Sequence, residues 1–424
     1  MKDQHAVRSI YSGLLRPVCG ALVVAVSSGC GPEGAEDSNP DDLTAPGVAE
    51  QSAAAASSRV DARRAMLKAY FAQRRSELPI VATTRTRYGQ LLDWIPRDSQ
   101  VPSGAVETPP PPPDGATTGT CSDCLTGDEL GPEGTVPILR RDTDDFLGKI
   151  DPPPSVMDFL SKYGLATGSI EAPGTNLHAA SDTLHSQNIS ATDANFPALA
   201  PFTALNDEFS LTQVWVQGLG SNNSTKDSVE SGVQKYQTLY GDQLAHFFVF
   251  FTNNGYVFHG DYWGGYNQDV KGWVQVSSNF FPGHVLGTGD TYTQVLKSGS
   301  AWWVWSGSAA QWVGYYPTSL FTTPGLKAAG DVVSWGGEVV DATADGVTTA
   351  TDMGTGKYCW ESGAAKIRNI RWRSSGGVWQ NFDKQFYAMD KSNCWNVEDH
   401  SNSGTTDGSY LLYGGPGNNP YFCP

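Results

Sequence analysis

From about residue 176 to the C-terminus, short apolar runs alternate with turn-forming residues. Some runs alternate apolar and polar positions, such as residues 213–217 (QVWVQ), and others are continuously apolar, such as residues 246–252 (HFFVFFT). These patterns are typical of strands buried on one face and on both faces. Many short strands joined by Gly-rich turns form sandwiches or barrels, so we predict an all-β, antiparallel β-sandwich over residues 176–424. Further strands are expected at residues 272–276, 301–305, 311–316, 332–340 and 409–413.

The sequence Asn253-Asn254-Gly255 follows the apolar run at residues 246–252. Asn-Gly between two apolar runs is a strong short-range signal of a tight β-hairpin. The pattern therefore predicts that residues 246–252 pair with residues 256–260 across this turn. We expect no long helix in this half of the chain.

Residues 59–175, called the leader below, predict a small mixed domain ahead of the sandwich. Over residues 59–77, Met66, Tyr70 and Phe71 recur at helical spacing, so one amphipathic helix is expected there. The leader therefore differs in texture from the β-rich half that follows it.

Three further patterns follow the predicted helix in the leader. Residues 91–96 (LLDWIP) are typical of a short strand, and the proline run at residues 109–113 predicts a stiff polyproline spacer. Thr143 is a suitable cap for a short helix, which the prolines at residues 152–154 would end.

The first thirty residues have the pattern of an export signal. Lys2, Arg8 and Arg16 give a positive start, and residues 17–26 form a short apolar core. Cys30 follows small residues, as in a bacterial lipobox, where the thiol carries lipid. We therefore expect a lipid anchor at Cys30, and a bacterial outer-membrane lipoprotein or, after processing, an extracellular protein. An ordinary signal peptide that contains a cysteine is the alternative.

Residues 31–58 are acidic, small and nearly free of large apolar side chains. Such a segment cannot bury enough surface to offset its chain entropy, so we expect a flexible tether. The whole chain has a formal net charge of −16. Because nucleic acids are bound by basic surfaces, the charge argues against a nucleic-acid partner.

The cysteine count also fits an exported protein, in which disulfides persist. Of the seven cysteines, Cys19 and Cys30 belong to the signal region, which leaves an odd number and hence one without a partner. The remaining five are Cys121, Cys124, Cys359, Cys394 and Cys423. The CxxC at residues 121–124 stands alone, so a structural disulfide is favoured over a redox or zinc site.

Common catalytic signatures are missing from the chain. We find no HExxH zinc motif, no GxSxG nucleophile elbow, no Walker loop and no GxGxxG between a strand and a helix. The sequence therefore predicts neither metal nor cofactor. Carboxylates, aromatic rings and amides remain as candidate functional groups.

Two glutamates have unusual surroundings. Glu230 lies in DSVESGVQ, directly before strand-like residues, and Glu338 lies in SWGGEVVD between glycines and valines. An ionised carboxylate is costly to desolvate, so a glutamate in such a place has a raised pKa, a partner or a task. Taken alone, each is also explained by an outward-facing position on an alternating strand.

The motifs around these glutamates resemble the neprosin family of glutamic peptidases. In the sandwich the similar stretches are residues 206–216, 228–242, 313–321, 335–341 and 413–424. In the leader, residues 91–96 and 134–141 (GTVPILRR) are also similar, so the resemblance covers roughly residues 85–424 in the family's order. With the lipobox-like Cys30, the chain looks like a bacterial lipoprotein-type member.

The resemblance implies a function and a pair of catalytic residues. The family's S-x-E-x-G and G-G-E motifs fall on Glu230 and Glu338, and a β-sandwich carries them in a long cleft. The implied activity is endopeptidase cleavage, in the best known members after proline. One glutamate would activate a water while the other, protonated, stabilises the oxyanion. The sequence does not assign these two roles, and an acidic optimum is expected because the pair must keep one proton.

Aromatic and amide side chains near the motifs are candidates for substrate binding. The aromatic rings suit a cleft that holds a flat proline ring, although most tryptophans in such a domain lie in the core. The candidates are Gln213, Trp215, Gln234, Trp263, Tyr266, Trp303 and Trp335.

Other implications concern cysteines and activation. Cys394 and Cys423 lie where the family has a C-terminal disulfide, and Cys359 would pair with Cys121 or Cys124. Plant-type members have two cysteines where this chain has none, in residues 260–273, which leaves proline specificity open. The resemblance also implies a zymogen whose leader covers the cleft until it is cut, here near residues 151–155, which would release the enzyme from its anchor.

Two other functions fit parts of the sequence. A non-catalytic carbohydrate-binding β-sandwich would explain the many aromatic residues, and a glycosidase would also use two carboxylates. A glutamate in both family motifs favours the peptidase. Its partners would be peptide or protein substrates, and we expect a monomer.

Overall fold

The computed structural model describes residues 69, 71–114, 121, 123–141, 175–183, 187–221, 224–257, 260–322, 325–342, 347–383, 386–419 and 423. The predicted signal peptide, the lipid site at Cys30, the tether and the helix capped by Thr143 lie outside the described residues. Of the amphipathic helix predicted at residues 59–77, residues 71–77 are described and are helical. Within the described ranges, no helix is long and apolar enough to cross a membrane.

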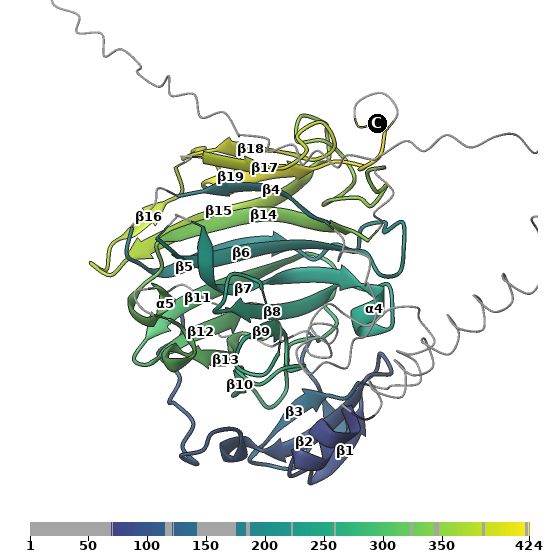
Figure 1. Cartoon of the computed structure of the whole chain (residues 1–424), viewed down its shortest axis with the longest axis vertical. Helices are drawn as coiled ribbons and strands as arrows, with labels where there is room; N and C mark the ends of the chain where they lie inside the picture. The colour runs from purple at the N-terminus through teal and green to yellow at the C-terminus, as the bar shows by residue number, and fades with distance from the viewer. Residues whose placement is uncertain are drawn as a thin grey trace, which may run out of the picture. The chain divides into compact units, whose positions relative to one another are not determined.

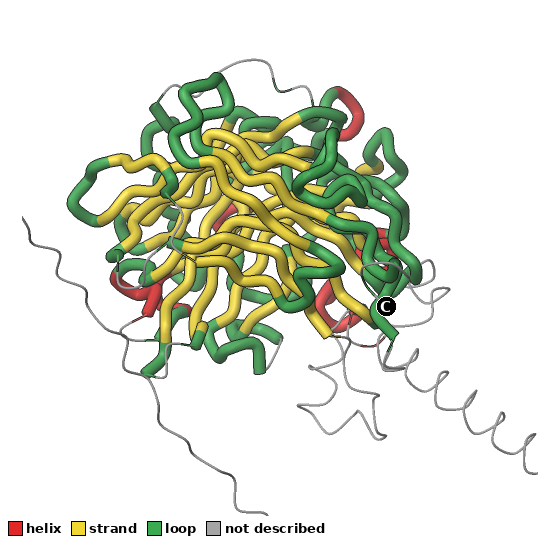
Figure 2. The backbone as a smooth tube through the Cα atoms, turned by 90° about the horizontal axis from the view of Figure 1, so that it is seen from above, coloured by secondary structure: helices red, strands yellow, loops and turns green. Residues whose placement is uncertain are grey.

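Residues 175–423 form two antiparallel sheets that pack face to face, which confirms the predicted all-β sandwich (Figure 1). Strands are the main regular structure of the described chain, and its helices are short (Figure 2). The larger sheet has the order β10 (Val274–Gln275), β13 (Gln311–Pro317), β12 (Ala301–Ser306), β11 (Asp290–Ser298), β5 (Ile189–Pro197), β15 (Ala365–Ser374), β19 (Tyr410–Gly414) and β18 (Asn396–His400), with β16 (Trp379–Asn381) beside β15. The second sheet has the order β17 (Phe386–Met389), β4 (Thr175–Asp182), β14 (Val332–Asp341), β6 (Phe209–Leu219), β7 (Thr225–Tyr236), β8 (His246–Thr252) and β9 (Gly264–Tyr266).

Alternation along the strands of the second sheet separates its two faces. On β6, Val214 and Val216 point into the hydrophobic core between the sheets, and on β14, Trp335 and Val339 do the same. The residues directly before and after each of these four therefore face away from the core. This second face of the seven-stranded sheet carries the site described below.

The hairpin predicted across Asn253-Asn254-Gly255 is wrong. Strand β8 pairs with β9, Gly264–Tyr266, rather than with residues 256–260. The side chain of Asn253 holds a wider loop, because its Nδ2 donates to the carbonyls of Tyr262 (2.8 Å) and Leu320 (2.6 Å). Two short helices also interrupt this half, α4 (Gln237–Tyr240) and α5 (Gly325–Ala328).

The described part of the leader forms a three-stranded antiparallel sheet with two short 3-10 helices. Its strands are β1 (Ala82–Arg85), β2 (Leu91–Pro96) and β3 (Thr135–Leu139), and its 3-10 helices are η1 (Arg97–Gln100) and η2 (Gly127–Glu129). A third 3-10 helix, η3 (Thr318–Leu320), lies in the sandwich. Strand β2 confirms the prediction for LLDWIP.

The leader packs directly against the sandwich. Leu92, Trp94 and Leu125 of the leader form one buried cluster with Phe281 of the sandwich. The proline run is docked on the sandwich, not a free spacer, because Trp312 Nε1 donates to the carbonyl of Pro110 at 2.8 Å. The leader and the sandwich therefore share hydrophobic core.

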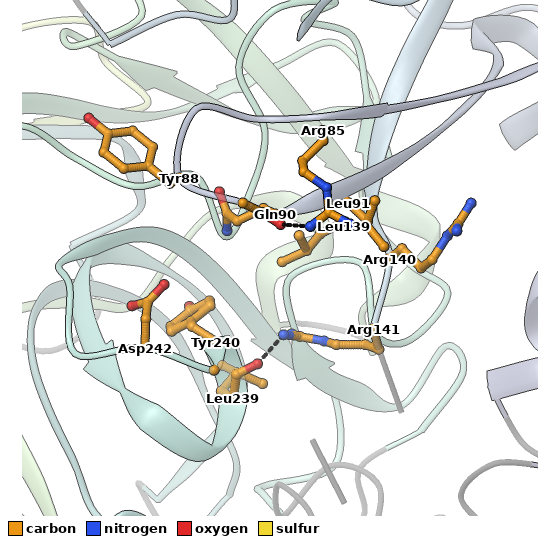
Figure 3. Close-up of a pocket in the computed structure, with 12 residues that line it drawn as sticks. Arg85, Tyr88, Gln90, Leu91, Leu139, Arg140, Arg141, Leu239, Tyr240 and Asp242 are labelled. Atoms are coloured by element: carbon orange, nitrogen blue, oxygen red, sulfur yellow. Dashed lines mark hydrogen bonds between the residues drawn. The ribbon is translucent and has the colours of Figure 1, made fainter. Parts of the chain in front are cut away.

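Polar contacts extend this interface. Arg141, at the end of the described leader, forms a buried ion pair with Asp269 at 2.7 Å and donates to the carbonyl of Leu239 (Figure 3). Gln90 Nε2 donates to the carbonyl of Gly283 at 2.8 Å. Gln90 and Arg141 of the leader line a small cavity of about 190 Å³ together with Leu239 of the sandwich.

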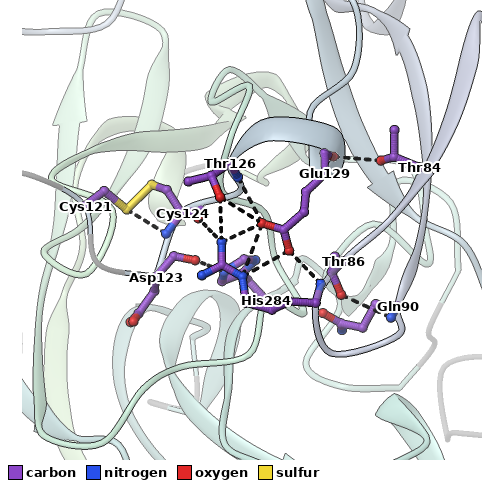
Figure 4. A network of polar contacts seen from close by, with 10 residues as sticks. Thr84, Thr86, Gln90, Cys121, Asp123, Cys124, Thr126, Glu129 and His284 are labelled. Carbon is purple, nitrogen blue, oxygen red and sulfur yellow. Dashed lines mark hydrogen bonds and ion pairs between the residues drawn. A yellow bond between two sulfur atoms is a disulfide. The ribbon is translucent and has the colours of Figure 1, made fainter.

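Inside the leader, an ion pair fastens the loop that carries the CxxC. Arg87 pairs with Glu129 at 2.5 Å and also donates to the carbonyl of Cys124. Figure 4 labels Glu129 and Cys124, the two partners of this guanidinium. On the sandwich side, His284 Nε2 contacts the carbonyl of Asp123 at 2.5 Å. Burial lowers the pKa of His284 to about 4, so this histidine is neutral at ordinary pH.

Both expected disulfides are present, Cys121–Cys124 and Cys394–Cys423. Cys359 is a buried free cysteine, so the expectation that it pairs with Cys121 or Cys124 is wrong. The CxxC closes on itself because its two cysteines are close enough in the chain to bond across a tight turn.

Candidate active site

The outer face of the seven-stranded sheet carries a cavity of about 530 Å³ that both glutamates line. Its walls combine polar side chains with a group of aromatic and apolar ones. The lining residues are Asn176, His178, Ala180, Asp182, Phe209, Trp215, Gln217, Thr225, Glu230, Phe250, Tyr256, Tyr266, Ser334, Glu338, Val340 and Ala388. The described leader, residues 69–141, contributes none of them.

Strand register places the two glutamates diagonally across β6. Glu230 on β7 lies opposite Trp215, and Glu338 on β14 lies opposite Leu211. Between these two positions, Gln213 lies opposite a glycine on each neighbouring strand, Gly232 and Gly336. The strands approach closely at these glycines, because a Cβ at Gly232 would lie 3.0 Å from Cβ of Gln213.

Glu230 is buried and contacts two hydroxyl groups. Ser228 Oγ donates to Oε1 at 2.5 Å, and Tyr256 Oη donates to the same oxygen at 2.6 Å. Burial, followed by the negative charge of Glu338, raises the pKa of Glu230 to about 7. Hydroxyl groups can donate or accept, so both partners tolerate either protonation state of this carboxyl.

Glu338 is equally buried but has different partners. Asn176 Nδ2 donates to Oε1 at 2.8 Å, and Gln213 Nε2 donates to Oε2 at 2.8 Å. Amide N–H groups only donate, so occupation of both oxygens favours the ionised carboxylate. Burial still raises the pKa of Glu338 above its ordinary value, while His178 and the two amides oppose that rise.

His178 completes this side of the cavity. Its Nε2 lies 3.7 Å from Oε1 of Glu338, and its Nδ1 lies 2.7 Å from Oδ2 of Asp390. Burial alone would lower the pKa of His178, but Glu338 and Asp390 outweigh it and raise that pKa to about 9. The hydrogen bond from His178 in turn lowers the pKa of Asp390.

Three of the seven predicted substrate-binding residues lie at the cavity: Gln213, Trp215 and Tyr266. Trp215 and Tyr266 line it, and Gln213 contacts Glu338 from the strand between the glutamates. Gln234 shares their face of the sheet, but it accepts a hydrogen bond from Tyr240 Oη (3.0 Å) and does not line the cavity.

The other three predicted substrate-binding residues, all tryptophans, do not line the cavity. Trp335 is fully buried between the sheets and packs on Phe382, because its position on β14 has the opposite parity to Glu338. Trp303 is buried in the other sheet, in a cluster with Trp312. Trp263 is 44% exposed and does not reach the cavity.

Sequence reasoning did not assign five polar residues of the site: Asn176, His178, Ser228, Tyr256 and Asp390. Asn176 and His178 are two residues apart on β4, so alternation places them on one face. Nothing local indicates that β4 pairs with β14, since Asn176 and Glu338 are 162 residues apart in the chain. Tyr256 and Asp390 are positioned by loops that have no periodicity to read.

The described residues contain no group of three or more His, Cys, Asp or Glu side chains that could hold a metal ion. The arrangement instead offers one carboxyl suited to the ionised form and one suited to the protonated form, at one cavity. Such a pair can act as base and acid on the same substrate.

Residues 206–416 match the model of the Neprosin family. This part of the chain is similar to the Neprosin family, and the matched range includes both glutamates, Gln213 and Asp390. It begins after β4, so Asn176 and His178 lie outside the match.

Three solved structures are similar to this chain at low identity. Two are Scytalido-glutamic peptidase with transition-state analogs, both at 9% identity; they cover 57% of this chain and 98% and 99% of theirs, with TM-scores of 0.31 and 0.30. The third is SCP-B of the Eqolisin family, in complex with the tripeptide Ala-Ile-His, at 8% identity; it covers 57% of this chain and 98% of its own, with a TM-score of 0.29. At such identities, evidence for function has to come from the site itself.

Proposed function

We propose that this protein is a glutamic peptidase that hydrolyses peptide bonds with Glu338 as the base and Glu230 as the acid. One observation carries this proposal: two buried glutamates line one cavity, where two amide donors favour the ionised form of Glu338 and the hydroxyl partners of Glu230 tolerate its protonated form. The match to the Neprosin family over residues 206–416 supports it.

The first step is attack by water on the substrate carbonyl. Ionised Glu338 takes one proton from the water, and the oxygen of that water forms a bond to the carbonyl carbon. The carbonyl oxygen becomes an oxyanion, which the protonated Glu230 stabilises by a hydrogen bond. The hydroxyl groups of Ser228 and Tyr256 hold Glu230 in place during this step.

The second step breaks the peptide bond. Glu338 passes the proton it has taken to the amide nitrogen, the C–N bond breaks, and the oxyanion returns to a carbonyl. The products are a carboxylic acid and an amine, with Glu338 ionised and Glu230 protonated as at the start. The net reaction adds one water across one peptide bond, and both glutamates are regenerated.

We further propose cleavage after proline. Phe209, Phe250, Tyr266 and Val340 form an apolar part of the cavity that contains both glutamates. A flat proline ring can pack on such a surface without unpaired polar atoms. Mass spectrometry of products from a mixed peptide library tests this point, and cuts spread over many residue types would contradict it.

Synthesis as a precursor, export and lipid attachment at Cys30 are also parts of the proposal. The resemblance of the leader supports the precursor, although residues 69–141 do not line the cavity. N-terminal sequencing of active enzyme tests it: a new N-terminus near residues 151–155 supports cleavage between the leader and the sandwich. Fully active enzyme that retains its anchor contradicts it.

The carbohydrate-binding alternative has less support than before. It depended on exposed aromatic residues, and Trp303 and Trp335 are buried. A glycan array with tight binding, together with no proteolysis, would restore it.

The central test is peptide cleavage by residues 31–424, before and after removal of the leader, at about pH 5 and pH 8. The matched variants are Glu230→Gln and Glu338→Gln, with Glu398→Gln on β18 of the other sheet as the control. We expect acid-dependent cleavage in the wild type and the control, and none in the two cavity variants. A folded wild type that cuts no peptide at either pH contradicts the proposal.

A further inference from the structure

A histidine and an aspartate lie beside the glutamate pair but take no part in the two steps above. His178 lies between two carboxylates, Glu338 on one side and Asp390 on the other. The backbone N–H of His178 also donates to Oδ2 of Asp390, at 2.8 Å, which fixes the ring from a second direction. An imidazole between two carboxylates favours the cationic form, in which both ring nitrogens donate.

We propose that His178, held by Asp390, is a positioning residue that keeps Glu338 ionised and leaves the proton of the pair on Glu230. This inference rests on the proposed peptidase function and adds an electrostatic cause for the two roles. Two coupled glutamates at one cavity would by themselves share a proton, and neither would be defined as the protonated one. A cation near one of them removes that symmetry.

The charges around the cavity support this assignment. Three carboxyl groups from other elements act on His178: Glu338 on β14, Glu230 on β7 and Asp390 in the segment after β17. On its own strand, β4, Asp182 also lines the cavity. Among the described lining residues, His178 is the only side chain that can carry a positive charge. The nearby Lys391 is directed elsewhere, because its Nζ donates to Thr348 Oγ1 at 2.6 Å. The positive charge at the cavity therefore comes from His178.

The position of His178 decides in which glutamate its positive charge stabilises the ionised form more. Its Nε2 is 3.7 Å from Glu338, whereas its influence on Glu230 is the last of the contributions to the pKa of that residue. A cation stabilises the ionised form of a nearby carboxyl, so it lowers the pKa of Glu338 more than that of Glu230. The active form, with Glu338 ionised and Glu230 protonated, is then populated over a wider range of pH.

The imidazole itself stays charged over that range. The pKa of His178 is raised to about 9, and the pKa of Glu230, which ends the range on the alkaline side, is about 7. Loss of activity at alkaline pH therefore reports Glu230, and loss at acid pH reports Glu338.

The test is the pH profile of kcat/KM for His178→Gln, which removes the charge and keeps a polar side chain. The acid limb is expected to move up by about one pH unit, so that kcat/KM on that limb falls about tenfold. The alkaline limb should move less. A profile that superposes on the wild type after scaling shows a structural role only and overturns the proposal.

His400→Gln is the matched control. The His400 side chain is 34% exposed, as is that of His178, and it also lies near a carboxylate, Glu398, at 3.5 Å. It lies on β18 of the other sheet, away from the cavity. The His400 variant should leave the pH profile unchanged.

A second measurement keeps the proposal testable if His178→Gln does not fold. NMR titration of the histidine rings in the wild type should show His178 still protonated at pH 8, and Asp390→Asn should lower its pKa by about one unit. A His178 that titrates near 6.5 in the wild type overturns the proposal. A folded wild type that cuts no peptide would instead contradict the peptidase function, and activity that survives in both Glu230→Gln and Glu338→Gln would contradict the assignment of these two residues as its catalytic pair.

Discussion

Gln213 donates a hydrogen bond of 2.8 Å from Nε2 to Oε2 of Glu338, from the strand that separates the two glutamate strands. The bond joins the central strand of the site to the residue we assign as the base. It also occupies the carboxylate oxygen that Asn176 leaves open, so both oxygens of Glu338 accept from an amide. The ionised state of Glu338 is thus supported by neutral donors as well as by His178.

Replacing Gln213 should weaken that support. Gln213→Leu removes a donor to the ionised carboxylate, so the pKa of Glu338 rises and the acid limb of the pH profile moves up. We expect a loss of about tenfold in kcat/KM on the acid limb, for a rise of one pKa unit. Gln234→Leu, a buried glutamine on the same face but outside the cavity, is the control. Equal profiles for the two variants would contradict the role given to Gln213.

Tyr256 should affect the opposite limb. Its hydroxyl donates to Glu230 at 2.6 Å, and this bond lowers the pKa of Glu230. Tyr256→Phe removes the bond and keeps the ring, so the pKa of Glu230 rises and the alkaline limb moves above pH 7. The measurement is kcat/KM between about pH 6 and pH 9. A shift confined to the acid limb would contradict the assignment of Glu230 as the protonated partner.

The raised pKa of Glu230 also predicts how stability depends on pH. Folding raises this pKa from 4.5 to about 7, so the folded state binds the proton more tightly than the unfolded state does. The stability that the protonated form of Glu230 gives to the folded state is fully present below pH 4.5 and is lost as pH rises through 7. The full difference corresponds to about 3 kcal/mol.

The measurement is the free energy of unfolding of the wild type and Glu230→Gln at about pH 4 and pH 8. Relative to the wild type, the variant should be more stable at pH 8 than at pH 4, because it has no buried charge to form. Glu398→Gln, whose side chain is 48% exposed, should show no such difference. If the free energy of unfolding changed equally with pH in Glu230→Gln and in the wild type, ionisation of Glu230 would not destabilise the folded state.

The leader should stay bound to the sandwich after a cut beyond Arg141. The ion pair between Arg141 and Asp269 is buried on both sides, and Trp94 shares a core with Phe281. Cleaved enzyme should therefore elute as one species that contains both fragments. Arg141→Met removes the guanidinium that pairs with the buried carboxylate of Asp269 and should destabilise the pair of fragments by about 3 kcal/mol.

The control for this variant is Arg97→Met, because Arg97 is half exposed and pairs only with the exposed Asp98. Surface ion pairs of this kind contribute little to stability. Spontaneous separation of the wild-type fragments on native size-exclusion chromatography would show that the leader is held mainly by the chain connection.

Period-2 patterns predicted much of the sandwich, whereas the two glutamates of the site were predicted from the resemblance to the neprosin family. The same alternation that places Glu338 on the outer face places Trp335, three residues earlier, in the core, so parity argued against Trp335 as a substrate contact. Alternation could not exclude Trp303 as a substrate contact. Trp303 lies in the other sheet from the cavity, and long-range strand pairing decides which strands share a sheet. His178 and Asp390 meet Glu338 only through that pairing and a loop, and neither has a local signal.

The most direct test of the account is kcat/KM at about pH 5.5 for Glu230→Gln, Glu338→Gln and the double variant. Groups that act as one unit are not additive. We therefore predict that kcat/KM falls at least about a thousandfold in each single variant. In the double variant, kcat/KM should be no lower than in the less active single variant, and Glu398→Gln should be close to the wild type. Substantial activity in either single variant, or losses that multiply in the double variant, would contradict a catalytic glutamate pair.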